Sequence, residues 1–121
     1  EFESEAALLS ELHHPNIVQL LGVCKHTAAG GSPEMLLVME YMSQGSLGEV
    51  LLKRDTDIPW LTRRQMALDA AKGMTYLHSL SPPVLHRDLK SPNLLVDGNN
   101  RVKIADFGLS RFRVEFTMTF C

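Results

Sequence analysis

The stretch His86-Arg87-Asp88-Leu89-Lys90-Ser91-Pro92-Asn93, followed by Asp106-Phe107-Gly108, decides how this 121-residue chain is interpreted. Two acids, an amide and a lysine stand in two short segments on either side of a strand-turn-strand pattern. Asp88 and Asp106 are 18 positions apart, and Asn93 and Asp106 are 13 apart. Few chemistries need this set, and phosphoryl transfer from a nucleotide is one of them. It requires a group that orients a hydroxyl, oxygen ligands for Mg²⁺ and a cation for phosphate charge.

The linked set resembles the catalytic and metal-binding loops of eukaryotic protein kinases. About eight positions match at fixed spacing, whereas Asp-Phe-Gly alone would be weak support. The resemblance implies an α+β fold of the protein-kinase type, truncated to part of the N-lobe sheet with its regulatory helix and the first part of the helical C-lobe. Residues 1–42 would form the N-lobe part and the hinge. Residues 43–121 would carry the catalytic loop, Asp-Phe-Gly and the start of the activation loop.

The bulk composition agrees with a folded domain and excludes several classes of protein. The chain is 45% hydrophobic, so it can bury a core, and its formal net charge of −2 gives no basic surplus for nucleic acid or an anionic membrane. No apolar run reaches the length of a membrane span. Cys24 and Cys121 form no disulfide framework, which favours reduced thiols in a cytoplasmic protein. The opening Glu1-Phe2-Glu3 lacks a start methionine, and we expect a chain cut at the front.

Residues 2–12 have helical periodicity and end before Pro15. Spacing alone gives Glu5 the role of a solvated surface charge. In the resemblance, Glu5 instead falls at the position of the regulatory helix whose carboxylate pairs with a catalytic lysine on a preceding strand, and that strand is absent here.

Residues 17–25 and 35–41 are predicted as strands on either side of a loop over 26–33, which contains Gly30 and Gly31. In the resemblance, the break in the pattern after residue 41 corresponds to the hinge, and adenine binds to this hinge. Met39 would lie behind the adenine, while the Glu40 carbonyl and the Met42 amide would face its edge. The alternative is that both methionines are ordinary core fillers.

Two helices are predicted after the hinge. Ser46 would cap a short helix over 47–53. A longer helix is predicted over 62–80, with Thr62 and Gln65 as a capping box and an inner face that includes Met66 and Gly73. His78, near its end, is interpreted as a helix residue rather than a metal ligand.

A β-hairpin is predicted from strands 94–96 and 102–104 with the turn Asp97-Gly98-Asn99-Asn100. It would bring Asn93 and Asp106 to neighbouring ends of paired strands. A separation of 13 leaves enough residues for one strand, a turn and the return strand.

The resemblance assigns chemical roles to these loops. Asp88 would accept a hydrogen bond from the substrate hydroxyl, and Lys90 would approach the transferring phosphate. Asn93 and Asp106 would bind Mg²⁺ through side-chain oxygens, and Leu95 would lie under the adenine. Taken singly, Asp88 and Asn93 could be turn residues and Lys90 a solvated lysine.

The remaining roles in the resemblance concern packing and regulation. His86 and Phe107 would join a hydrophobic stack between the lobes, although His86 could also be considered as a general base. Arg87 would pair with a phosphate on the following loop, where Ser110, Thr117 and Thr119 are candidate phosphosites. Threonines in such a loop are often unmodified.

Lys90-Ser91-Pro92-Asn93 is similar to serine/threonine kinases, and Leu20-Leu21-Gly22-Val23-Cys24 with Met39-Glu40-Tyr41-Met42 looks like the tyrosine-kinase-like group. The resemblance therefore implies an ATP- and Mg²⁺-dependent kinase that acts on serine or threonine of a protein substrate. The alternative is a non-catalytic kinase-like binding or scaffold module. Because a kinase domain needs roughly twice this length, we expect residues 1–121 alone to be poorly folded or inactive.

Overall fold

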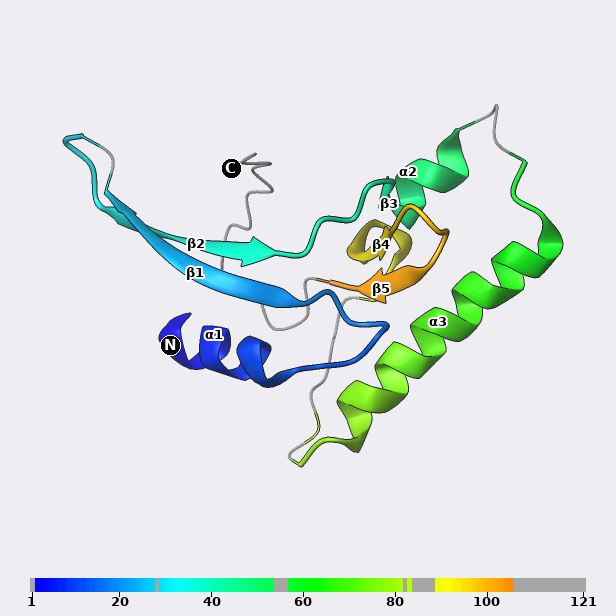
Figure 1. Cartoon of the computed structure of the whole chain (residues 1–121), viewed down its shortest axis with the longest axis horizontal. Coiled ribbons are helices and arrows are strands. Elements are labelled where there is room, and N and C mark those ends of the chain that lie inside the picture. Colours follow the sequence, from blue (N-terminus) through cyan, green and yellow to red (C-terminus); the bar gives the residue numbers. More distant parts are fainter. Residues whose placement is uncertain (1, 28, 54–56, 82, 84–88, 106–121) are drawn as a thin grey trace.

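The computed structural model describes residues 2–27, 29–53, 57–81, 83 and 89–105. Two small antiparallel sheets and three α-helices make up this part of the chain (Figure 1). In chain order the elements are α1 (Phe2–Glu11), β1 (Leu20–Thr27), β2 (Pro33–Met39), β3 (Gly45–Ser46), α2 (Leu47–Leu52), α3 (Trp60–Ser79), the 3₁₀ helix η1 (Ser91–Asn93), β4 (Leu94–Val96) and β5 (Val102–Ile104). This mixed architecture with two small sheets agrees with the predicted α+β class.

The two sheets occupy different parts of the molecule. The long strands β1 and β2 pair with each other, from Leu20 opposite Met39 to Thr27 opposite Pro33. The short strands form a second sheet in the order β3-β4-β5. Figure 1 shows α1 beside β1 and the long helix α3 on the side of β5, and both pairs of elements are in contact.

The segment between α1 and β1 joins the first part of the chain to the last described strand. Asn16 is buried; its carbonyl accepts from Ile104 N at 2.8 Å and its Nδ2 donates to Val102 O at 3.1 Å. Val18 N in turn donates to Ile104 O at 3.0 Å. These bonds satisfy buried backbone groups across a large sequence separation.

Gly73 allows α3 to pack against this joint. A Cβ added there would lie 2.7 Å from Asn16 O and 2.8 Å from Ile104 Cδ1. Both distances are below van der Waals contact, and the first involves a backbone atom that is itself hydrogen-bonded. Glycine is therefore required for α3 to approach this closely.

One main hydrophobic core lies between α1, α3 and the short sheet. Leu77 of α3 and three β4–β5 residues, Val96, Val102 and Ile104, are completely buried. The predicted inner face of the long helix is confirmed at Met66, Gly73 and Leu77, which are buried. Apolar residues at helical spacing thus cover one side of the hairpin, and this burial is the main stabilising term of the fold.

Most predicted elements are found, with shifted ends. The hairpin strands and the Ser46 cap are confirmed, since Ser46 Oγ accepts from Glu49 N at 3.1 Å. The capping box at Thr62 is wrong: α3 begins at Trp60 after Pro59, and no side chain caps it. Because proline has a fixed φ suited to a helix start, Thr62 lies inside the first turn, where it cannot cap. The two-residue strand β3 was not predicted.

Across the described segments, no helix has the length and apolar character that a membrane crossing requires.

Candidate functional site

The β4–β5 hairpin brings the residue before β4 and the residue after β5 together. Ala105 N donates to Asn93 O at 3.0 Å, and Asn93 N donates to Lys90 O at 2.9 Å within the turn of η1. Asn93 is 9% exposed, whereas Lys90 is exposed. The predicted approach of the two loops is therefore confirmed as far as Ala105. Asp106, the next residue, lies outside the described residues.

Three of the predicted adenine-contacting residues lie in one apolar cluster. Its buried members are Val18, Met42 and Ala105, and Met39 and Leu95 pack against them. The cluster links the end of β2, the segment after it, β4 and the residue that follows β5. A cluster of this composition suits the face of a planar, largely apolar ring, and it also agrees with the alternative of two core methionines.

Glu40 anchors the segment after β2 through its side chain. Its Oε1 accepts from Gln19 N at 2.8 Å, and its Oε2 pairs with Lys103 Nζ at 2.9 Å. The side chains of Glu40 and Lys103 are 26% and 19% exposed, so water screens this pair only partly. Glu40 N also donates to Gln19 O at 2.9 Å. The predicted hinge segment is thus fixed to β5 and to the residue before β1.

The turn of the β4–β5 hairpin is tied to the same segment. Gln44 Nε2 donates to Asp97 O and to Asn100 Oδ1, both at 2.7 Å. Asp97 Oδ1 accepts from Asn99 N and Arg101 N, which organises the turn. Asn100 has a φ of +61°, a left-handed conformation that asparagine tolerates better than most residues.

On its other side the hairpin is held by Asp69, a completely buried aspartate of α3. Its Oδ1 accepts from Arg101 Nη2 and from Gln65 Nε2, both at 2.8 Å. Its Oδ2 accepts from Arg101 Nε and from Val102 N, both at 3.0 Å. Four donors therefore surround one carboxylate, including a two-point contact from a guanidinium.

These contacts determine the ionisation of Asp69. Burial is the largest single influence and by itself would raise the pKa of the carboxyl group. The hydrogen bonds from Arg101, Val102 and Gln65, with the charge of Arg101, act in the opposite direction and together prevail, so the pKa of Asp69 is lowered. Asp69 is therefore an anion in the folded protein at neutral pH.

The sequence of this chain matches a known protein family over nearly its whole length. The family model described as "Protein tyrosine and serine/threonine kinase" matches residues 1–118. This chain belongs to the protein kinase family.

Curated relatives of this chain also carry the names of protein kinases. The probable serine/threonine-protein kinases drkC and drkB of Dictyostelium discoideum are 54% and 48% identical to it, over 93% and 100% of the chain. The serine/threonine-protein kinase CTR1 of Arabidopsis thaliana is 49% identical over 93% of the chain. The chain spans only 15%, 17% and 13% of the lengths of these three relatives.

Several predicted residues of the kinase site lie outside the described residues. They are Asp88, Arg87, Asp106, Thr117 and Thr119, together with His86, Phe107 and Ser110. Glu5 belongs to α1, but its side chain is also outside the described part. The described members are Met39, Glu40, Met42, Lys90, Asn93 and Leu95, and the structure gathers them around the predicted hinge segment and the β4–β5 hairpin.

Of the two predicted Mg²⁺ ligands, Asn93 belongs to the described residues. Among the described residues, no three His, Cys, Asp or Glu side chains lie close enough to hold a metal ion. Asn93 supplies an amide oxygen, the type of hard ligand that Mg²⁺ accepts, at a position fixed by backbone bonds to Lys90 and Ala105. Its chemistry and placement thus fit the predicted role, with Asp106 as the second predicted ligand.

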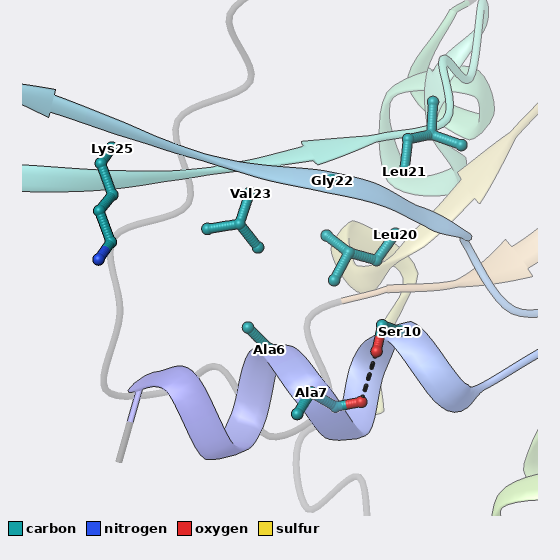
Figure 2. A pocket seen from close by; sticks show the side chains of 8 residues that line it. All are labelled: Ala6, Ala7, Ser10, Leu20, Leu21, Gly22, Val23 and Lys25. Carbon is teal, nitrogen blue, oxygen red and sulfur yellow. Dashed lines mark hydrogen bonds between the residues drawn. The ribbon is translucent and has the colours of Figure 1, made fainter.

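A pocket of about 370 Å³ lies elsewhere, between α1 and β1 (Figure 2). It is lined by Ala6, Ala7, Ser10, Leu20, Leu21, Gly22, Val23 and Lys25. Figure 2 shows the Ser10 hydroxyl turned back to the Ala7 carbonyl, to which it donates at 2.6 Å. Among the described residues, none of those predicted for nucleotide or metal binding lines this pocket.

The sequence interpretation missed the anchoring roles of Asp69, Gln44 and the Glu40 side chain. A signal for Asp69 was available: it lies between Met66, Ala70 and Gly73 on a predicted inner face, where a charged residue needs a partner. Arg101 could not be identified as that partner from spacing, since 32 positions separate the two.

Proposed function

We propose that the protein containing this chain is an ATP-dependent protein serine/threonine kinase, which transfers the γ-phosphoryl group of Mg-ATP to a hydroxyl of a protein substrate. The observation that carries the proposal is the hydrogen bond between Ala105 N and Asn93 O. It places the segment that leads into Asp-Phe-Gly beside the end of the catalytic-loop motif. The printed names of the relatives, which are serine/threonine-protein kinases, support the substrate class.

The adenine of ATP would bind at the apolar cluster. Met39 lies behind the ring, Leu95 lies beneath it, and the Glu40 carbonyl and the Met42 amide bind its edge. The packing of Met39, Met42 and Leu95 in one cluster supports this assignment. We place the boundary between the N-lobe part and the C-lobe part between residues 42 and 43, directly after this hinge.

The phosphates would lie at the open end of the hairpin. Asn93 and Asp106 hold Mg²⁺, which when bound neutralises charge on the phosphate oxygens. The Lys90 ammonium, on an exposed side chain, approaches the transferring group. Asp88 accepts a hydrogen bond from the substrate hydroxyl and directs its oxygen toward phosphorus.

Two further roles depend on groups outside the chain or on modification. Glu5 pairs with a lysine of a preceding strand, and Arg87 binds a phosphate on Thr117 or Thr119. We place the protein in the cytoplasm, since two widely separated cysteines favour a reducing compartment.

We further propose that residues 1–121 do not act alone. Large apolar side chains of α2 and α3 are open to solvent, with Leu52 82%, Trp60 78% and Leu61 74% exposed. Such surfaces are ordinarily covered in a complete domain. Phosphorylation of a peptide by purified residues 1–121 with Mg-ATP would contradict this part of the proposal.

The catalytic proposal is tested by Asp88→Asn in the full-length protein. The substitution keeps the size of the side chain but weakens its ability to accept the hydroxyl proton, and we expect transfer to a serine/threonine peptide to fall by about 10²–10⁴-fold. ATP binding should be retained. Transfer that is unchanged by Asp88→Asn would instead favour a non-catalytic binding module, with the wild-type signal coming from a contaminant.

A further inference from the structure

The buried carboxylate of Asp69 accepts four hydrogen bonds, an unusually large number of polar contacts for one side chain inside a core. Removing a carboxylate from water is costly, and a buried ion pair often contributes little net stability. Here the carboxylate is completely buried, whereas the Arg101 side chain is 48% exposed. An apolar residue at position 69 could fill the same place between Met66 and Gly73 without that cost.

The position of the contacts suggests what the carboxylate provides. Val102 is the first residue of β5, and its N–H donates to Asp69 Oδ2 at 3.0 Å. Arg101, the residue before it, donates twice to the same carboxylate. Asp69 therefore fixes the start of β5 both along the strand and in distance from α3.

Strand β5 connects this anchored start to the region of the proposed Mg²⁺ ligands. β5 contains only three residues, and Ala105 follows it directly. Ala105 N donates to Asn93 O, which couples the position of β5 to the position of Asn93. A shift at Val102 would be transmitted over three residues to Ala105, because a strand of this length is nearly inextensible.

We propose that Asp69 is a positioning residue for phosphoryl transfer: by holding Arg101 and Val102 it sets the place of Ala105 and Asn93, and with them the Mg²⁺ site. The inference rests on the proposed function. Asp69 touches neither substrate nor metal, and it acts through β5. Its burial as an anion is explained by the need to hold a strand rather than by stability alone.

The test uses the full-length protein and compares Asp69→Asn with the same substitution at the exposed Asp57. Groups that orient metal ligands typically account for 10–100-fold in affinity or activity. We expect Asp69→Asn to lower kcat about tenfold and to raise the free Mg²⁺ needed for half-maximal rate at least about threefold. The KM for the peptide should change less than about twofold, and Asp57→Asn should match the wild type.

Kinetic values are expressed per folded active site, determined by nucleotide titration, so that a loss of folded protein alone changes nothing. A double-mutant cycle with Arg101→Ala adds a second criterion. If both side chains act through β5, the double variant should be little worse than Asp69→Asn. Wild-type kcat and Mg²⁺ dependence in Asp69→Asn, with only a lower melting temperature, would overturn the proposal.

Hydrogen exchange separates this proposal from the proposed function, since it needs no catalysis. In Asp69→Asn, amides of the segment 94–105 should exchange at least about tenfold faster, with β1–β2 amides unchanged. Unchanged exchange in that segment would contradict the anchoring step. A wild-type protein that transfers no phosphoryl group would contradict the proposed function, whatever the exchange result.

Discussion

The two β-hairpins of this chain are held by different means. β1–β2 is long, with eight and seven residues, and side chains such as Leu21 (64%) and Val38 (47%) are exposed. β4–β5 has three residues in each strand, and Val96, Val102 and Ile104 are completely buried. The long hairpin is supported by its own ladder of backbone bonds and by contact with α1, whereas the short one is fixed by several surrounding elements.

Polar side chains from outside the β4–β5 hairpin provide that fixation. Asp69 binds it from α3, Gln44 binds its turn, Asn16 binds Val102 O, and Glu40 pairs with Lys103. Its sheet gains a third strand only from the two residues of β3, so the short hairpin is marginal by itself. The hairpin nearest the proposed chemistry is therefore positioned by long-range side-chain contacts rather than by strand length.

The largest effect is expected from removing packing in the short hairpin. Ile104→Ala should lower the free energy of unfolding by about 2–5 kcal/mol, because its side chain is completely buried and a cavity would remain. Leu21→Ala in the long hairpin should change it by less than about 0.5 kcal/mol. Denaturant unfolding of the full-length protein measures both, and equal losses would contradict the contrast between the hairpins.

A smaller effect is expected from pH. Because the pKa of Asp69 is lowered in the folded state, the unfolded chain binds its proton more readily. The stabilising contribution is therefore complete above the usual aspartate pKa of about 4 and is lost as the pH falls through the lower folded pKa. The melting-temperature difference between wild type and Asp69→Asn should be constant above about pH 5 and should shrink toward pH 3. A difference that grows on acidification would refute the assignment.

The smallest effect on stability is expected at the proposed hinge. Lys103→Ala removes the partner of Glu40 and should lower the free energy of unfolding by about 1 kcal/mol, since the pair is only partly exposed. Lys25→Ala, at an exposed position of β1, serves as the matched control and should have almost no effect. The difference between the two variants should decrease when salt is raised from about 0.1 M to 1 M. A salt-independent difference would point to lost packing instead.

Local patterns predicted much of the fold. Two short apolar segments on either side of the Asp97–Asn100 turn predicted the β4–β5 hairpin, and helical spacing predicted the inner face of α3. The start of α3 was wrong because Pro59 outweighed the capping signal of Thr62. β3 was missed because its two residues are too few to show any periodicity.

The site was predictable in part, and for a different reason. The resemblance to protein kinases grouped Met39, Met42 and Leu95 around the adenine. The structure packs these three residues into one cluster. Asp69, Gln44 and the Glu40 side chain were missed because their partners, apart from Gln65, lie 21 to 63 positions away, and a single sequence does not show which distant polar groups meet. Asp88 and Asp106 remain predictions.

The contact between Asn16 and Val102 also bears on how the protein is made. The two residues are 86 positions apart, and ribosomes add roughly 5–20 residues per second. The buried amide of Asn16 therefore waits about 4–17 s for its acceptor to be synthesised. During that interval the segment 16–18, with the apolar Ile17 and Val18, lacks β5, to which it later binds through backbone hydrogen bonds. A chaperone that recognises nascent chains therefore has time to bind before the two distant segments close.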